Sequence, residues 1–532
     1  MSAQTTTAAG GLAPTPAKGL RAGILDLGDS VMLGLASTAP VYSLAATLGL
    51  IVAVNGTYTP LILVLGFVPV LFIAYAFREL NSALPDCGTT FIWARRAFGP
   101  WAGWLGGWGV ALAGVVVLAN LAEVAGQYLW LLVGDGSLAH NSLVVTATGV
   151  LFIALMTLVN YRGIRLGEHV QRVLTYVQYV SLGIFAVALV FRIAGGVPGG
   201  TGLAFDAEWF NPAGAVADPG AAVHGALLAL FIYWGWDTCL AVNEETENPA
   251  TTPGRGAVIS AFVLVAIYVS MALLVMMYAS VGTEGIGLGN EANQGDVFLA
   301  MKDTVLGPWG WLIVVAVLAS VLSSTQTTIL PTARGTLSMA VHGAIPPRFG
   351  RVHPRNQTPG FSTQVMGAAA IGYYVLMSVF SENLLADSIS SISLFIAFYY
   401  ALTGFACVWY FRATFRTSAR NLWFRGILPL LGALLLTAAF FVSAVQMWDP
   451  GYGDTQIFGV GGAFASGVVL LALGVVLAIF CRFAPSTRGY FLQQPDPAHQ
   501  PDPAQQPAPA QQPAPGHPGG AQPGGSGHRM LP

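Results

Sequence analysis

Hydrophobic residues occur along this chain in long, nearly uninterrupted runs that contain few polar positions. Twelve of these runs are long enough to cross a bilayer as a helix, which needs about 20 residues. They cover residues 27–54, 59–77, 101–131, 143–159, 169–194, 221–242, 256–281, 309–340, 360–380, 386–411, 423–446 and 457–481. The pattern predicts an all-α membrane protein with twelve transmembrane helices.

Two of the runs, the first and the sixth, contain residues that interrupt a helix near the middle of the membrane. Pro40 lacks a backbone donor, and Gly235 weakens a helix just before Asp237. Backbone groups freed at that depth are tolerated only where protein or a water-filled cavity receives them. If the first ten helices form two repeats of five, the breaks occupy equivalent positions, as in the substrate site of a secondary transporter. The residues expected to bind substrate there are Gly34, Ala36, Ser37, Thr38, Phe231, Tyr233, Trp234 and Gly235.

Composition and charge agree with this topology. Charged residues make up 9% of the chain, against about 25% in a soluble domain. If the N-terminus is cytoplasmic, only Arg192 and Lys302 of the 22 basic residues fall in outer segments. We therefore expect a multi-pass plasma membrane protein with both termini in the cytoplasm. Residues 1–22 and 484–532 have the composition of disordered tails, and residues 23–483 form the twelve-helix domain.

Other polar side chains within the runs are candidates for a permeation path. Asn120, Glu123 and Gln127 share one face of the third helix. They either line the path or are satisfied by neighbouring helices near the outer surface. Gln178 in the fifth helix is a further candidate, although a single amide often serves to join two helices.

The eighth run and the segment after the sixth have unusual polar content. Ser323, Ser324 and Thr327 belong to a dense group of hydroxyl residues. They either form a cation site with carbonyls of the first helix or bond to their own helix backbone. The acidic segment 243–249 lies where basic residues are expected. It either pairs with cytoplasmic arginines, as a gate or latch, or forms a solvated turn.

Several stretches together carry a family resemblance. Segment 231–249 has a Gly-aromatic-acid break and then Glu-Glu-x-x-Asn-Pro. Segment 79–100 contains Leu-Pro, a glycine, an aromatic residue and Phe-Gly-Pro. Segment 334–346 reads Arg-x(4)-Met-Ala-x-x-Gly-x-Ile-Pro. Over residues 20–480 the chain resembles an amino acid permease of the amino acid–polyamine–organocation (APC) superfamily.

The resemblance implies a leucine-transporter-type (LeuT-type) fold, with five-plus-five inverted repeats, broken helices 1 and 6, and two extra helices. It also implies that a substrate carboxylate binds at the first break and its amine near the second. The chain departs from the family at two places. Residues 36–38 read Ala-Ser-Thr where the family has Gly-Ser/Ala-Gly, and Gln178 stands where some proton-coupled members have lysine.

The expected function is secondary active transport of amino acids by alternating access, as proton-coupled symport or exchange. Asp237 is the first candidate for the proton carrier and Glu123 the second, because burial disfavours a charged carboxylate. Asp237 could instead cap its half-helix, and sodium could replace the proton. A polyamine or organic-amine carrier and a permease-like nutrient sensor are the other readings. We expect no catalytic residues, cofactor, metal site or nucleic-acid partner; the partners are the substrate and the lipid bilayer.

Overall fold

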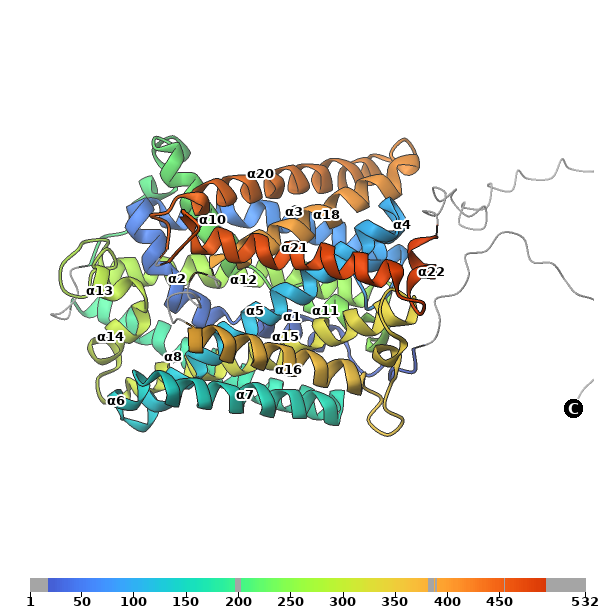
Figure 1. Ribbon diagram of the computed structural model, residues 1–532. Helices are drawn as coiled ribbons and strands as arrows, with labels where there is room; N and C mark the ends of the chain where they lie inside the picture. Colours follow the sequence, from blue (N-terminus) through green and yellow to red (C-terminus); the bar gives the residue numbers. More distant parts are fainter. Residues whose placement is uncertain (1–17, 197–201, 381–386, 388–389, 454, 494–532) are drawn as a thin grey trace, which may run out of the picture.

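The structure is a computed structural model that describes residues 18–493 apart from 197–201, 381–386, 388–389 and 454. Long helices run roughly side by side and form a bundle (Figure 1). The long helices are α3 (Thr59–Ala83), α5 (Pro100–Val133), α7 (Ser142–Arg162), α8 (Ile164–Gly195), α12 (Thr252–Ala279), α15 (Trp311–Val341), α16 (Gly360–Phe380), α18 (Ile392–Phe411), α20 (Leu428–Trp448) and α21 (Gly462–Phe483).

Shorter elements connect or complete these helices. The shorter α-helices are α1 (Leu27–Ser37), α2 (Pro40–Asn55), α4 (Thr90–Phe98), α6 (Gly136–Ala139), α9 (Pro212–Ala215), α10 (Pro219–Ile232), α11 (Thr238–Ala241), α13 (Glu291–Gln294), α14 (Val297–Leu306), α19 (Ala419–Asn421) and α22 (Arg488–Phe491). A π-helical turn, η7 (Leu422–Ile427), leads into α20, and β1 (Gln456–Ile457) pairs antiparallel with β2 (Val460–Gly461). The 3-10 turns are η1 (Gly56–Tyr58), η2 (Ala207–Phe210), η3 (Asn243–Glu245), η4 (Gly307–Trp309), η5 (Pro347–Gly350) and η6 (Arg412–Thr414).

The centre of the bundle contains the two divided helix pairs, α1 with α2 and α10 with α11. Helix α15 packs along α5, α8 and α1, while α1 also packs against α12. Helix α10 lies against α2 and α3. The halves of the interrupted helices are therefore held by the long helices around them.

The expected count of twelve separate spans is only partly recovered. Within the described residues, nine segments are long and apolar enough to cross a membrane, judged by length and composition. One of these, Leu27–Ala83, contains the first two expected spans, because η1 continues the helix across residues 56–58. The sixth expected span is reduced to the shorter apolar helix α10 followed by α11, because residues 233–237 break it.

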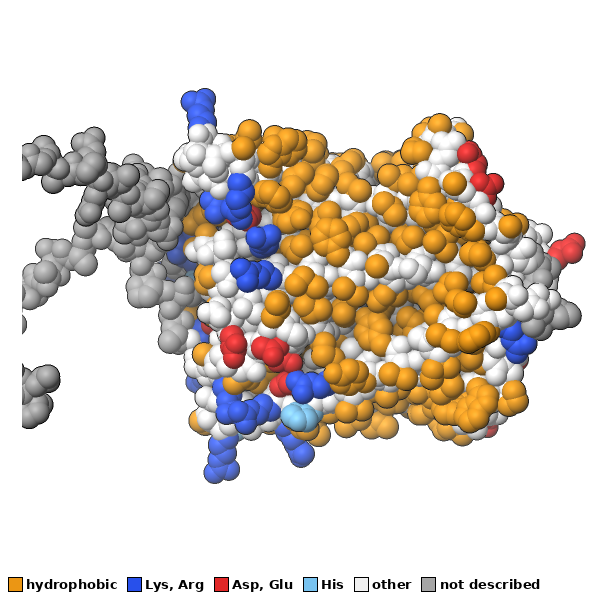
Figure 2. Space-filling model, turned by 180° about the vertical axis from the view of Figure 1, so that it is seen from behind, with side chains coloured by type: hydrophobic (Ala, Val, Ile, Leu, Met, Phe, Trp, Pro, Cys, Tyr) orange, Lys and Arg blue, Asp and Glu red, His pale blue; other side chains and the backbone are white. Residues whose placement is uncertain are grey.

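The two ends of the bundle differ in charge. Figure 2 shows hydrophobic side chains over the middle of this face and Lys and Arg gathered towards one end. We call this the basic end. It carries the α3–α4 connection, where Asp86 pairs with Lys18, and helix α4, where Arg95 bonds to Gln493. Both ends of the described chain therefore lie on the same side of the bundle, as the sequence predicts.

The folded part extends beyond the domain boundaries expected from composition. Lys18, in the expected tail of residues 1–22, is buried against Asp86. Helix α22, in the expected tail of residues 484–532, buries Tyr490, whose hydroxyl donates to the Pro100 carbonyl at 2.9 Å. A single lysine or a pair of aromatic residues hardly changes the composition of a segment. Composition alone therefore does not predict these contacts.

Close helix crossings depend on small residues, as is usual in membrane bundles. Helices α5 and α7 pack through Gly126 and Gly149. A Cβ atom at Gly149 would lie 2.7 Å from the Ala122 carbonyl oxygen, and one at Gly126 would lie 2.6 Å from that of Val145. The two helices could accept larger side chains there only by moving apart.

We predict that Gly149→Leu lowers the midpoint of thermal unfolding in detergent, because overpacking costs about 1–3 kcal/mol. Gly183→Leu is the matched control, since a Cβ at Gly183 in α8 meets no atom within 4 Å. Its midpoint should stay at that of the unmodified protein. Equal midpoints for the two variants would contradict the packing described here.

Candidate functional site

The first break has the position predicted from the sequence. Helix α1 ends at Ser37 and α2 begins at Pro40, so the interruption covers Thr38 and Ala39. Ala39 has a left-handed backbone with φ 46°, which turns the chain between the two halves. The Thr38 carbonyl accepts a hydrogen bond from the Ser43 hydroxyl at 2.8 Å. Part of the freed backbone is thus satisfied by hydroxyl side chains.

The second break lies directly against the first. Between α10 and α11, Gly235 has φ 116°, a conformation that favours glycine. A Cβ atom there would lie 2.8 Å from the Ser37 carbonyl carbon and oxygen and 3.0 Å from the Thr38 nitrogen. The Ser37 and Thr238 hydroxyls are 2.8 Å apart. The two interrupted helices therefore meet backbone to backbone, and no side chain fits between them.

The eighth-helix hydroxyls contribute unequally to this crossing. In α15, the Ser324 hydroxyl donates to the Ser37 carbonyl at 2.7 Å. The Ser323 hydroxyl lies 3.3 Å from that of Thr175 in α8, and Thr327 donates to carbonyls of its own helix. Only the Ser324 contact reaches the first break. Ser324 therefore has the contact with a first-helix carbonyl that a cation site would need, whereas Thr327 bonds to its own helix backbone.

Gln178 is the most unusual polar residue near α15. It lies in α8 and is fully buried. Neither its amide nitrogen nor its amide oxygen has a hydrogen-bond partner among the described residues. Gln178 therefore does not join two helices by a hydrogen bond to a described residue, and a buried amide without a partner costs free energy.

Asp237 is held by two neutral hydroxyl groups. The Tyr399 hydroxyl donates to its Oδ2 atom and the Tyr400 hydroxyl to its Oδ1 atom, both at 3.1 Å. The Trp234 indole donates to the Tyr399 oxygen at 2.5 Å, which links the second break to the carboxylate through α18. Asp237 precedes α11, but its side chain makes no capping bond, so the capping interpretation is wrong in this conformation.

Other residues of the predicted substrate set are occupied in helix packing. A Cβ at Gly34 would lie 2.5 Å from the Ser260 hydroxyl oxygen, so this glycine permits the close approach of α1 and α12. Ala36 is fully buried. The Tyr233 hydroxyl donates to the Leu63 carbonyl at 3.1 Å. These three residues position the breaks.

A vestibule opens beside α2 on the side of the breaks away from the basic end. Its larger cavity, of about 450 Å³, is lined by Tyr42, Glu123, Gln127 and Asp296 among others. A second cavity of about 210 Å³ shares Tyr42 and is lined by Phe231. Of the predicted substrate residues, Phe231 lines the smaller of these two cavities, and none of them lines the larger one.

Acidic and neutral polar groups lie among the apolar side chains that line the larger cavity. The Tyr42 hydroxyl donates to Asn120 at 2.7 Å, and the Tyr374 hydroxyl donates to Glu123 at 2.6 Å. Gln127 also donates to Glu123, at 3.1 Å. Both predicted alternatives for the polar face of α5 therefore hold: Glu123 and Gln127 line a cavity, and side chains of neighbouring helices form hydrogen bonds with Asn120 and Glu123. None of the described lining residues is a lysine or arginine.

Sequence reasoning missed the partners of these groups. Tyr399 and Tyr400 lie more than 160 residues from Asp237, and Asp296 enters the vestibule from a connection between helices. Two adjacent tyrosines inside an apolar run are a usable signal, because buried tyrosine hydroxyls usually find a partner. Asp296 carries no such signal.

Comparison with known proteins gives this architecture a family. A sequence model described as "Amino acid permease" matches residues 30–482. This chain belongs to the amino acid permease family, within the APC superfamily. The match covers both breaks, α15 and the acidic segment after α11. It also agrees with the resemblance carried by the sequence motifs.

Several transporters are similar to this permease. The low-affinity putrescine importer PlaP of Escherichia coli K12 is 22% identical over 78% of this chain and 87% of its own length. The glutamate/serine transporter AimA of Bacillus subtilis is 25% identical over 72% of this chain and 70% of its own. An uncharacterized transporter of Mycobacterium tuberculosis is 27% identical over 65% of this chain and 72% of its own.

We predict that Gly235→Ala abolishes uptake of labelled substrate by proteoliposomes. The variant should still insert into the membrane and elute as a single species in size-exclusion chromatography. The added methyl group would collide with the Ser37 backbone, and the backbone at φ 116° is strained for any residue but glycine. Gly335→Ala in α15 is the control, since its Cβ meets no atom within 4 Å. Uptake by the Gly235 variant at the wild-type rate would contradict the backbone contact.

Proposed function

We propose that this permease moves amino acids across the plasma membrane by alternating access, with the basic end in the cytoplasm. The supporting observation is the backbone contact of the two interrupted helices at Gly235 and Ser37. The start of α2 offers amide groups and a positive dipole end to a carboxylate, and carbonyls of residues 231–234 can accept an ammonium group. The divided helices support a twelve-helix, LeuT-type arrangement of inverted repeats.

The substrate would bind when the breaks separate slightly. Ser37, Thr38 and Gly235 provide the backbone groups, and Phe231 closes the site from the vestibule. A phenyl ring over an ammonium group contributes about 0.5–2 kcal/mol. The vestibule supports entry from the side opposite the basic end.

Asp237 is the proposed proton carrier, with Glu123 as the second candidate. Its described partners, Tyr399 and Tyr400, are neutral, so a proton can be gained or lost without breaking an ion pair. Loss of the proton turns two hydroxyl contacts into stronger charge-assisted bonds. Sodium remains the rival, held by the Ser37 carbonyl and Ser324.

Asp237→Asn tests this coupling in proteoliposomes. Asparagine keeps the shape but cannot titrate, so exchange of labelled substrate should stay within a few-fold of wild type. Accumulation driven by an imposed pH gradient should be lost. Asp303→Asn is the control, because Asp303 is exposed and pairs only with Lys302 among the described contacts. If the Asp237→Asn protein still concentrates substrate on a pH gradient, Asp237 is not the proton carrier. If only a sodium gradient drives uptake by the unmodified protein, transport is not coupled to protons.

Transport of a cationic amine is the second candidate, and one observation favours it. The larger vestibule cavity presents Glu123 and Asp296 and no lysine or arginine among its described lining residues. Such a surface attracts ammonium groups and repels free carboxylates. The similarity to a putrescine importer also favours transport of a cationic amine.

Glu123→Gln separates the two candidates. If amines enter through the vestibule, the KM for putrescine should rise about tenfold, equal to ~1.4 kcal/mol, while that for serine stays within twofold. Glu284→Gln, in an exposed segment, is the matched control. No saturable putrescine uptake by the unmodified protein would rule out the amine carrier.

A further inference from the structure

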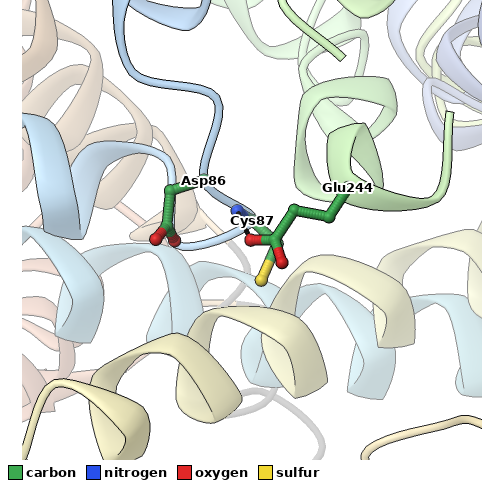
Figure 3. Close-up of side chains that lie close together, drawn as sticks. All are labelled: Asp86, Cys87 and Glu244. Atoms are coloured by element: carbon green, nitrogen blue, oxygen red, sulfur yellow. Dashed lines mark hydrogen bonds between the residues drawn. The ribbon is translucent and has the colours of Figure 1, made fainter. Parts of the chain in front are cut away.

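A lysine ammonium group is buried at the basic end among three potential metal ligands. Lys18 Nζ lies 2.7 Å from Asp86 Oδ1, 2.5 Å from Glu244 Oε1 and 3.4 Å from Cys87 Sγ. The Lys18 side chain has no exposed surface. Figure 3 shows Asp86, Cys87 and Glu244 drawn together from two separate parts of the chain.

These three ligands form a compact site that requires a cation. One ligand atom from each lies within 4.8 Å of the others. Asp86 Oδ2 is buried and has no hydrogen-bond partner among the described residues. Asp86 is buried and Glu244 is partly buried, and two carboxylates at this separation repel each other unless a positive charge lies between them. Burial alone would lower the pKa of Lys18, but the surrounding Cys87, Asp86 and Glu244 raise it above its usual value.

The site joins elements that must separate if the basic end opens. Asp86 and Cys87 belong to the α3–α4 connection, whereas Glu244 follows α11, the second half of an interrupted helix. The Cys87 backbone N–H also donates to Glu244 at 3.0 Å. Movement of α11 would therefore pull one ligand away from the other two.

The segment that follows Lys18 is fixed to the same place. The Ile24 and Leu25 amides donate to the Glu245 carbonyl at 2.9 and 3.2 Å, and the Glu247 amide donates to Leu25 at 2.8 Å. The Glu245 side chain accepts two bonds from Arg334 of α15, at 2.5 and 3.0 Å. The chain before α1 is thus bound to the acidic segment by its backbone and by its one buried lysine.

We propose that Asp86, Cys87 and Glu244 form a cation-binding site whose occupant is Lys18 of the chain's own N-terminal segment. The segment is a tethered plug that holds the basic end closed while the vestibule at the other end is open. The inference rests on the proposed function only in that alternating access requires this end to open. Release of Lys18 removes the cation that joins the two carboxylates. Asp86 then keeps its bonds from Ser338 and Gly88 and has His342 at 4.0 Å, but no charged group any longer holds it to Glu244.

Cys87 is a reporter of this plug, because its thiol is 1% exposed and touches Lys18. In a background where the other three cysteines are serine, the alkylation rate of Cys87 by a membrane-impermeant maleimide measures opening. Lys18→Gln should raise that rate at least tenfold. Lys18→Arg should leave it within threefold, since the charge remains. Lys302→Gln changes a lysine that pairs with Asp303 away from the basic end, and it should leave the Cys87 alkylation rate unchanged.

A second background separates opening of this end from general loosening. With Cys407 as the only cysteine, Lys18→Gln should leave alkylation unchanged, because Cys407 is buried in α18. An unchanged Cys87 rate in the Lys18→Gln protein overturns the proposal. A parallel rise at Cys407 overturns it as well, because the lysine would then be a general stabiliser.

Cadmium ion probes the emptied site directly. In the Lys18→Gln protein, Cd²⁺ should bind the thiol and carboxylates and protect Cys87 from alkylation. Adding Asp86→Asn should weaken this protection at least tenfold. Equal protection with and without Asp86 would contradict a three-ligand site. These assays need no substrate, so absence of transport would count against the proposed function and leave this inference standing.

Discussion

The structure depends on one close approach, that of the Gly235 backbone to the peptide between Ser37 and Thr38. A helix that is interrupted inside a membrane exposes backbone groups that lipid cannot satisfy. Here the two breaks pack against each other, and hydroxyl groups from α2, α11 and α15 form hydrogen bonds at the first break. The long helices around them hold the four half-helices in place. Substrate binding at this crossing would exchange protein contacts for ligand contacts at little cost in exposed polar backbone.

The two ends of the bundle are built differently, and this asymmetry suits a molecule closed at one side. At the basic end, Glu79 pairs with Arg420 and Arg425, and Glu245 pairs with Arg334. The Glu245–Arg334 pair is buried on both sides, and removing one partner of such a pair costs about 3–5 kcal/mol, so opening this end requires that pair to separate as a unit or find other partners. At the opposite end, polar residues such as Tyr42 and Glu123 line cavities and are held by hydrogen bonds to side chains of other helices.

Much of the fold and part of the site could be predicted from the sequence, for local reasons. Pro40 and Gly235 act on their own backbone, so both breaks were correctly expected. The pairing of the breaks, the tyrosines at Asp237 and the lysine at Asp86 depend on contacts between distant segments, which periodicity does not encode. The predicted count of twelve spans is not confirmed by the nine apolar segments among the described residues, in part because the first two expected spans are continuous through η1 and the sixth is divided between α10 and α11. Within the predicted substrate set, Phe231 lines a cavity, whereas Gly34 permits the close approach of α1 and α12.

A structure determined with a transported substrate bound tests the central claim most directly. The account predicts substrate density at the crossing of the two breaks, within hydrogen-bond distance of the Ser37–Thr38 amides and of carbonyls between residues 231 and 234. Gly235 should then lie further from Ser37 than in the structure described here. Substrate density elsewhere, with the two breaks still in backbone contact, would contradict the account.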